Sequence, residues 1–253
     1  MEVLNENANP GQQGTQIDAL GHFASLNDTW DGASELAADG ARYYGGLTQA
    51  EVKPTPDSPL LRLGVDKMPP LVTSAILLDA RTHVGGGEPM SAGQHVTPEH
   101  IEAMLEAAGL AERGILPGDI VLIYTGWSSD HYEDPDTSGV YYSMAPGLSY
   151  ESAQHLGERR IVAAGLDTPF VDAVADGQLA GTSPPPSGTP TGMVFPVHEH
   201  FLTEVGIHTL EGLKLKAMAD DGVSVSCAMV LPVLTKGGAG APIRPVAIGT
   251  PSS

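Results

Sequence analysis

The sequence contains one cysteine and few basic or aromatic residues. A single cysteine, Cys227, allows no internal disulfide, which fits the reducing cytosol. Only 12 Lys and Arg accompany 31 Asp and Glu, and the net charge of −19 repels polyanions, so neither nucleic acid nor an anionic membrane is expected as a partner. Aromatic residues make up 5% of the chain, so aliphatic side chains must fill its core. Cys227 lies in the apolar run 223–233 and is expected to be buried there.

Long apolar runs are also absent. No window of 18 apolar residues occurs, so no membrane span is expected. The first 13 residues have neither the basic nor the apolar region of a signal peptide. We therefore expect a cytoplasmic protein whose residues 1–13 form a flexible arm.

Apolar residues, by contrast, make up 41% of the 253 residues, enough for a buried core. Apolar runs predict strands, and apolar spacing with capping residues predicts helices. The strands are expected at 71–80, 120–124, 160–166, 207–210, 223–233 and 242–248, the helices at 33–44, 99–113, 149–159 and 197–205, and the main loops at 52–70, 81–94, 125–146 and 181–192. This alternation predicts a single α/β domain over residues 14–253, with a mixed β-sheet and flanking helices.

Two segments contain residue types that bind metals and transfer protons. Near the N-terminus, Asp18 and His22 lie four residues apart behind a Gly-Thr turn, and Gln12 and Gln16 precede them with the same spacing. Spacing alone also fits a turn with a capping Asp and a surface His.

The second segment pairs His198 with Glu211. A helix, a turn at Gly206 and a short strand separate the two, so the chain could return and bring them side by side. With nine histidines in the chain, this pair alone is weak evidence for a site.

Together these segments resemble the metal-dependent cyclase/formamidase hydrolase family, which includes kynurenine formamidase and isatin hydrolase. The family motif His-x-Gly-Thr-His-x-Asp-x-x-x-His aligns with residues 12–22. Other matching segments follow in order along nearly all of the chain: Tyr44-Gly45-Gly46, 116–122 running into Thr125-Gly126-Trp127, 146–149, 165–169 and 198–211.

The resemblance implies a fold of the swivelling β/β/α type and assigns roles to residues. The metal ligands of the family fall on Gln12, Gln16, Asp18, His198 and Glu211, and its catalytic acid/base falls on His22. Two of these positions usually hold histidine. Gln16 matches a branch of the family that has Gly-Thr-Gln, and Gln12 is a further change. An amide oxygen is a weaker ligand than imidazole, so one divalent ion, Mn or Zn, is more plausible than two.

The activity that the resemblance implies is metal-dependent hydrolysis of an amide, a cyclic amide or a lactone, in an amidase/formamidase or lactonase type of enzyme. His22 would transfer the proton, and Trp30 and Trp127 are expected to line the substrate pocket. The family also implies a homo-oligomer, a dimer or tetramer. Two alternatives remain: a metal-dependent cyclase or lyase, and a non-catalytic binding protein that has lost metal ligands. Against the latter, Asp18, His22, His198 and Glu211 are retained together.

Overall fold

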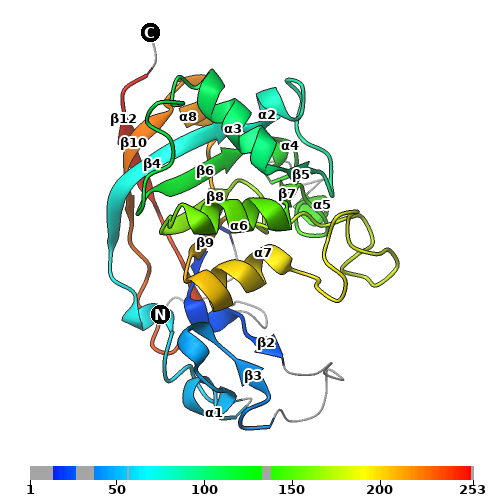
Figure 1. Cartoon of the computed structure of the whole chain (residues 1–253), viewed down its shortest axis with the longest axis vertical. Helices are drawn as coiled ribbons and strands as arrows, with labels where there is room; N and C mark the ends of the chain where they lie inside the picture. Colours follow the sequence, from blue (N-terminus) through cyan, green and yellow to red (C-terminus); the bar gives the residue numbers. More distant parts are fainter. Residues whose placement is uncertain (1–13, 27–36, 56, 133–137, 252–253) are drawn as a thin grey trace.

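An eight-stranded mixed sheet forms the centre of the protein (Figure 1), in a computed structural model that describes residues 14–26, 37–55, 57–132 and 138–251. Its strand order is β11-β1-β9-β8-β6-β4-β10-β12. The neighbours from β4 through β6 and β8 to β9 are parallel, and the outer pairs are antiparallel. The strands are β1 (Gln16–Asp18), β4 (Leu71–Asp79), β6 (Ile120–Tyr124), β8 (Ala163–Leu166), β9 (His208–Glu211), β10 (Val225–Val230), β11 (Gly240–Pro242) and β12 (Val246–Gly249). The expected α/β fold with a mixed sheet is thereby confirmed.

The sheet curls back on itself. Strands β11 and β12 lie at opposite edges of the strand order, yet only Ile243, Arg244 and Pro245 separate them in sequence. The two edges must therefore approach each other, and the curled sheet encloses its own apolar core. That core includes Leu122 of β6 and Leu210 of β9.

Helices cover the outer face of the parallel strands. They are α3 (Pro98–Ala107), α6 (Tyr150–Glu158) and α7 (Pro196–Glu199), the last continuing into the π-helical turn η4 (His200–Val205) (Figure 1). Their apolar side chains form a second core with the sheet, in which Phe201 and Leu156 are fully buried. On the inner side, α8 (Lys216–Asp220) packs against the enclosed core. Among the helices of the described residues, none combines the length and apolar character needed to cross a membrane.

Helix ends follow the local sequence. Thr97 caps α3 in a capping box with His100, with Pro98 at the first helical position, as the Thr-Pro-Glu-His sequence predicts. The expectation that this helix reaches residue 113 is wrong, because Gly109 has a φ of 70° and ends it. Ser149 caps α6 by accepting a hydrogen bond from the Ser152 backbone.

A small lobe lies at the bottom of Figure 1. It contains β2 (Ser25–Leu26), β3 (Ala41–Arg42), the short turns η1 (Leu20–His22) and η2 (Tyr44–Gly46), and α1 (Gln49–Val52). The helix expected at 33–44 is wrong where the structure describes it, because a turn closed by Gly40 on Ala37 leads directly into β3. Residues 27–36 lie outside the described residues.

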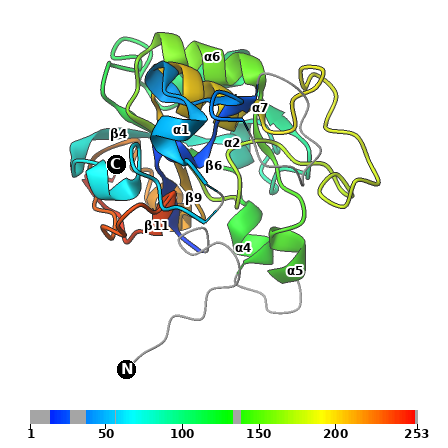
Figure 2. The same ribbon diagram turned by 90° about the horizontal axis from the view of Figure 1, so that it is seen from below.

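Other departures concern loops and Cys227. The expected loop 81–94 begins within α2 (Ala80–His83) and is followed directly by the strand β5 (His95–Val96). The expected loop 125–146 contains α4 (Trp127–His131) and α5 (Ser138–Tyr141), which lie side by side in Figure 2. The strand β7 (Gly147–Leu148) pairs with β5, and η3 (Val65–Lys67) precedes β4. Cys227 is exposed and not buried, because side chains alternate along β10 and point Ser226 and Ala228 inward instead.

Candidate metal centre

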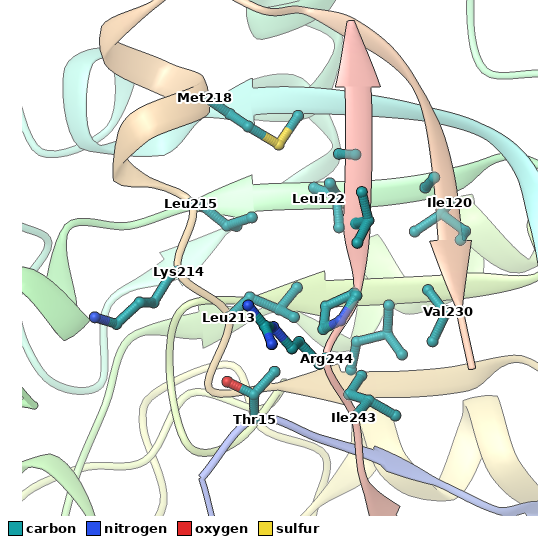
Figure 3. A pocket seen from close by; sticks show the side chains of 15 residues that line it. Thr15, Ile120, Leu122, Leu213, Lys214, Leu215, Met218, Val230, Ile243 and Arg244 are labelled. Carbon is teal, nitrogen blue, oxygen red and sulfur yellow. The ribbon is translucent and has the colours of Figure 1, made fainter. Parts of the chain in front are cut away.

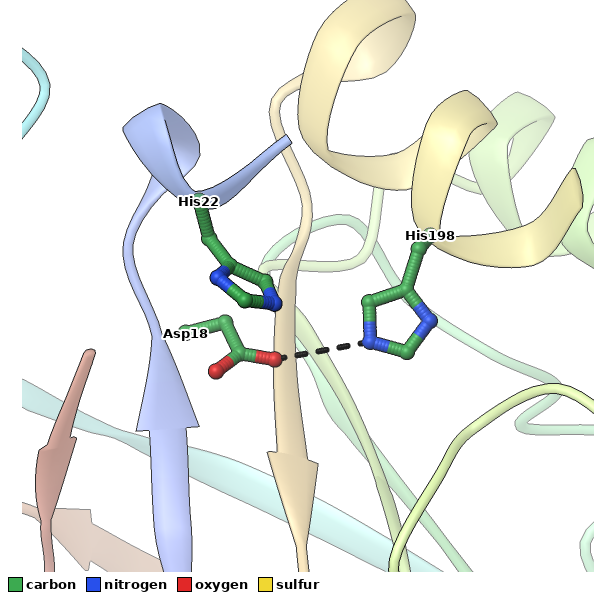
Figure 4. Close-up of side chains that lie close together, drawn as sticks. All are labelled: Asp18, His22 and His198. Carbon is green, nitrogen blue, oxygen red and sulfur yellow. Dashed lines mark ion pairs between the residues drawn. The ribbon is translucent and has the colours of Figure 1, made fainter. Parts of the chain in front are cut away.

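Three of the expected site residues converge from segments far apart in the sequence (Figure 4). Asp18 ends β1, His22 lies in the η1 turn that follows, and His198 lies on α7. Their ligand atoms, one from each residue, all lie within 4.8 Å of one another. The structure therefore brings together both segments that the sequence marked out.

Glu211 reaches the same place from the strand beside β1. In the antiparallel pairing of β1 with β9, Gln16 lies opposite Glu211. Oε1 of Glu211 is 3.1 Å from Nε2 of His198, and Oδ2 of Asp18 is 3.5 Å from the same nitrogen. His198 Nε2 thus faces two carboxylates, and all three residues are at least 95% buried.

Asp172, which sequence reasoning missed, fixes the orientation of His198. Its Oδ2 accepts a 2.6 Å hydrogen bond from Nδ1 of the His198 ring, and the backbone N–H groups of His198 and Val197 donate to its two oxygens. With Nδ1 used in this way, Nε2 is the ring nitrogen directed at Asp18 and Glu211. A carboxylate behind a histidine is the usual support of metal-binding imidazoles.

Further hydrogen bonds hold the two facing carboxylates. Thr209 Oγ1 donates to Oδ2 of Asp18 at 2.5 Å. Gln16 Nε2 donates to Oε2 of Glu211 at 2.8 Å, and the Val171 N–H donates to Oε1 at 3.1 Å. The amide nitrogen of Gln16 is therefore engaged with Glu211, and an amide nitrogen is not a metal ligand. That Gln16 is itself a ligand stays a prediction.

Burial and mutual charge shift the titration of these groups. Burial raises the pKa of Asp18, but the nearby His22 and the hydrogen bond with His198 lower it more, so its pKa lies below the usual range. Burial and the charge of Asp18 raise the pKa of Glu211. Burial lowers the pKa of His198, but its hydrogen bonds to Asp172, Asp18 and Glu211 raise it well above its usual value. The pKa of His22 is lowered, mainly by burial, so its ring is neutral near pH 7.

Phenylalanines form one side of the centre. The ring of Phe23 stacks on the His198 ring, with centroids 5.3 Å apart and an interplanar angle of 30°. Phe195 meets the same imidazole edge to face at 5.8 Å, and Phe170 packs against Phe195. Three of the four phenylalanines of the chain therefore gather here, and each is half-buried. Their positions beside His22 and His198 in the sequence were a signal that could have found two of them.

Of the two tryptophans expected to line the substrate pocket, the structure describes only Trp127. Trp127 is buried on α4, with its ring 4.1 Å from that of His131 and packed with Tyr141. Asp167 holds its turn by accepting hydrogen bonds from the backbone and hydroxyl groups of Thr125 and Ser128. That Trp127 lines the substrate pocket stays a prediction. Trp30 and Gln12 lie outside the described residues.

The donor set fits a divalent cation. Asp18 and Glu211 supply carboxylate oxygens, and His198 supplies an imidazole nitrogen oriented by Asp172. Carboxylate oxygens and imidazole nitrogens are both common ligands of divalent metal ions in proteins. The three carboxylates around one imidazole also concentrate negative charge in a buried place, which a cation would offset.

Comparison with known proteins gives one family and a set of solved structures. The family described as "Putative cyclase" matches residues 5–173. A crystal structure of a novel cyclase superposes with a TM-score of 0.71 at 22% identity, covering 94% of this chain and 69% of that one. Isatin hydrolase A from Ralstonia solanacearum gives 0.60 at 21% identity, covering 94% and 72%, and an isatin hydrolase bound to the product analogue thioisatinate gives 0.57 at 19%, covering 96% and 73%. No curated protein matches the chain. At these identities the structures show a shared fold.

Proposed function

Because the chain belongs to the putative cyclase family, we propose that it is a metal-dependent hydrolase of an amide, a cyclic amide or a lactone. The observation that carries the proposal is the convergence of Asp18, His22 and His198 within 4.8 Å, with Glu211 beside them. The isatin hydrolases among the structural neighbours act, by their names, on a cyclic amide, which agrees with this reaction class.

One divalent ion, Mn or Zn, would be held by Asp18, His198 and Glu211. When bound, such an ion lowers the pKa of water and polarises a carbonyl group. The chain's own part is to present these ligands in fixed positions: Asp172 sets the ring of His198, and Gln16 sets the carboxylate of Glu211. Gln16 and Gln12 remain the further ligands that the family resemblance suggests.

His22 is placed to move the proton. Its ring is neutral near pH 7 because burial lowers its pKa, so a ring nitrogen can accept a proton from water while the water oxygen attacks the carbonyl carbon. The bond from that carbon to nitrogen or oxygen then breaks, and His22 returns the proton to the departing atom. Asp18, whose charge opposes the lowering of this pKa, steadies the imidazolium that forms.

The same centre suits a planar, partly apolar substrate. Phe23 and Phe195 present half-buried rings beside His198, and such faces pack well against flat groups. We expect a small molecule of this kind as the substrate.

Metal content tests the proposal most directly. Protein prepared without chelator and supplied with Mn or Zn should retain about one ion per chain, and Asp18→Asn should retain far less. Asp66→Asn, at an aspartate of the η3 turn outside the candidate ligand set, is the control and should retain as much as the unaltered protein. Equal retention by Asp18→Asn would overturn the metal site.

Turnover tests the reaction. N-formyl amides, cyclic imides and lactones should be hydrolysed with uptake of one water, and His22→Ala should slow the reaction about 10²–10⁴-fold without loss of metal. His83→Ala, at an exposed histidine of α2, is the control. A product isomeric with its substrate or formed by elimination would instead identify the cyclase or lyase alternative.

Assembly is a further part of the proposal. We expect the protein to be cytoplasmic and to form a homo-oligomer. The oligomer is supported by the outer face of β4, β10 and β12, which exposes the apolar side chains Val72, Val225 and Ile248 together. Measurement of the molar mass in solution, with Ile248→Lys as the variant expected to dissociate, tests this expectation.

A further inference from the structure

A cavity of about 310 Å³ lies inside the curled sheet (Figure 3). Its lining includes Leu210 of β9 and Thr15, which directly precedes β1. Because side chains alternate along a strand, the neighbours of these two residues, Glu211 and Gln16, point to the opposite face, where the candidate metal centre lies. The cavity and the metal centre are therefore back to back and share strands but no lining side chain.

The walls of the cavity are apolar and come from the enclosed core. The lining side chains that also belong to this core are nearly completely buried. They include Leu122, Leu210, Leu213, Leu215, Val230 and Ile243. Native interiors are close-packed, so an apolar cavity of this size is an uncommon feature. Its volume also falls at the lower end of small-molecule binding pockets, which favour the mouths of curled sheets and barrels.

The mouth of the cavity carries positive charge. Arg244 lies in the three-residue link between β11 and β12, and in Figure 3 its guanidinium lies near Thr15 and Leu213. It is exposed and forms no hydrogen bond or ion pair with any described residue. Lys214 also belongs to the lining, but in Figure 3 its ammonium points away from the cavity, and no acidic side chain lines the cavity among the described residues. In a chain with 12 basic and 31 acidic residues, an arginine at an apolar opening that no acidic side chain of the described residues lines is an unusual local balance.

We propose that this cavity binds a small amphipathic carboxylate, with its apolar part inside the curled sheet and its carboxylate at Arg244. Arginine suits this role because its planar guanidinium can donate two parallel hydrogen bonds to one carboxylate. Thr15 does not compete for it, because its hydroxyl already donates to the Gly212 carbonyl at 2.6 Å. The binding site does not depend on the metal centre or on the reaction proposed above.

Octanoate is a suitable probe, and its binding to the full chain can be measured by calorimetry. We expect one site per chain, with 1-octanol, which has the same tail and no charge, and octylammonium each binding at least about tenfold more weakly. Arg244→Gln should weaken octanoate about tenfold and leave 1-octanol unchanged, whereas Arg62→Gln, at an exposed arginine elsewhere, should change neither.

Two tryptophan substitutions on β12 form a matched pair. Ala247 lines the cavity and is exposed at its mouth, so Ala247→Trp should block octanoate with little strain on the fold. Ile248 is the next residue and points to the outer face, so Ile248→Trp should leave octanoate binding intact. Unchanged binding to Ala247→Trp, or no binding to the unaltered chain, would overturn the proposal. So would an oligomer that dissociates on Ala247→Trp, since the cavity would then be filled by a second copy.

Discussion

Replacement of Asp172 by asparagine tests the support of the metal centre while leaving every candidate ligand in place. The carboxylate accepts three N–H groups: Nδ1 of His198 at 2.6 Å, the His198 backbone at 3.2 Å and the Val197 backbone at 2.7 Å. Asparagine has one oxygen, so its NH₂ group must face at least one of these donors. If that donor is Nδ1, the histidine keeps its proton on Nε2, the nitrogen that faces Asp18 and Glu211, and that nitrogen can no longer bind a cation.

The expected losses follow from these contacts. A hydrogen bond to a charged group contributes about 1.5–3 kcal/mol, so Asp172→Asn should lower the free energy of unfolding by about 2–4 kcal/mol in urea titrations. Loss of such a support should also weaken Mn binding about 10–100-fold by calorimetry. Asp119→Asn is the control, because Asp119 is equally buried and accepts hydrogen bonds from Arg113 and the Leu116 backbone far from the site. It should cost stability and leave Mn affinity unchanged. If Asp172→Asn behaves like this control, Asp172 stabilises only the start of α7 and the reasoning fails.

Three further predictions concern stability. Burial raises the pKa of Asp119, but hydrogen bonds from Arg113 and Ser74 lower it more. Its contribution to the free energy of unfolding is therefore complete above the unfolded pKa of about 4 and is lost as pH falls through the lowered folded pKa. The urea midpoint of Arg113→Met should accordingly depend less on pH between about 5 and 2 than that of the unaltered chain. Gln16→Leu removes the donor to Glu211 and should cost about 1–3 kcal/mol of unfolding free energy, with thermal unfolding as the measurement; no change would show that the contact is unimportant. Phe201→Ala empties a fully buried place in the helix-side core and should cost about 3–5 kcal/mol by urea titration while Mn affinity is retained in the folded protein.

The parallel part of the fold was predictable because buried parallel strands read as apolar runs. Expected strands at 71–80 and 120–124 match β4 and β6 closely. The curling of the sheet could not be predicted from the sequence. It depends on the pairing of β11 with β1, more than 200 residues away, and of β12 with β10, about 20 residues away. The expected helix at 33–44 failed because helical spacing of a few apolar residues says little where Asp39-Gly40 makes a turn.

The residues of the candidate site were likewise predictable only in part. The motif placed Asp18 and His22, and the later pair His198 and Glu211 joins them as the resemblance implied. Asp172 gave no local signal, because an aspartate in a loop is an ordinary residue until the fold sets its oxygens against α7. A metal-binding histidine is usually supported by a carboxylate, but the sequence does not indicate which of the 31 acidic residues supports His198.

We propose one cation rather than two at this site, on the basis of the charge of its residues. Asp18 and Glu211 carry two negative charges when both are ionised, and one divalent ion balances them. The charge of Asp172 is directed to the other side of the His198 ring and to two backbone N–H groups. A second ion would need further ligands, and Gln16 offers only a neutral amide whose nitrogen is engaged with Glu211. In the proposed site, Gln16 therefore adds no charge that could balance a second ion, and its hydrogen bond holds the carboxylate of Glu211.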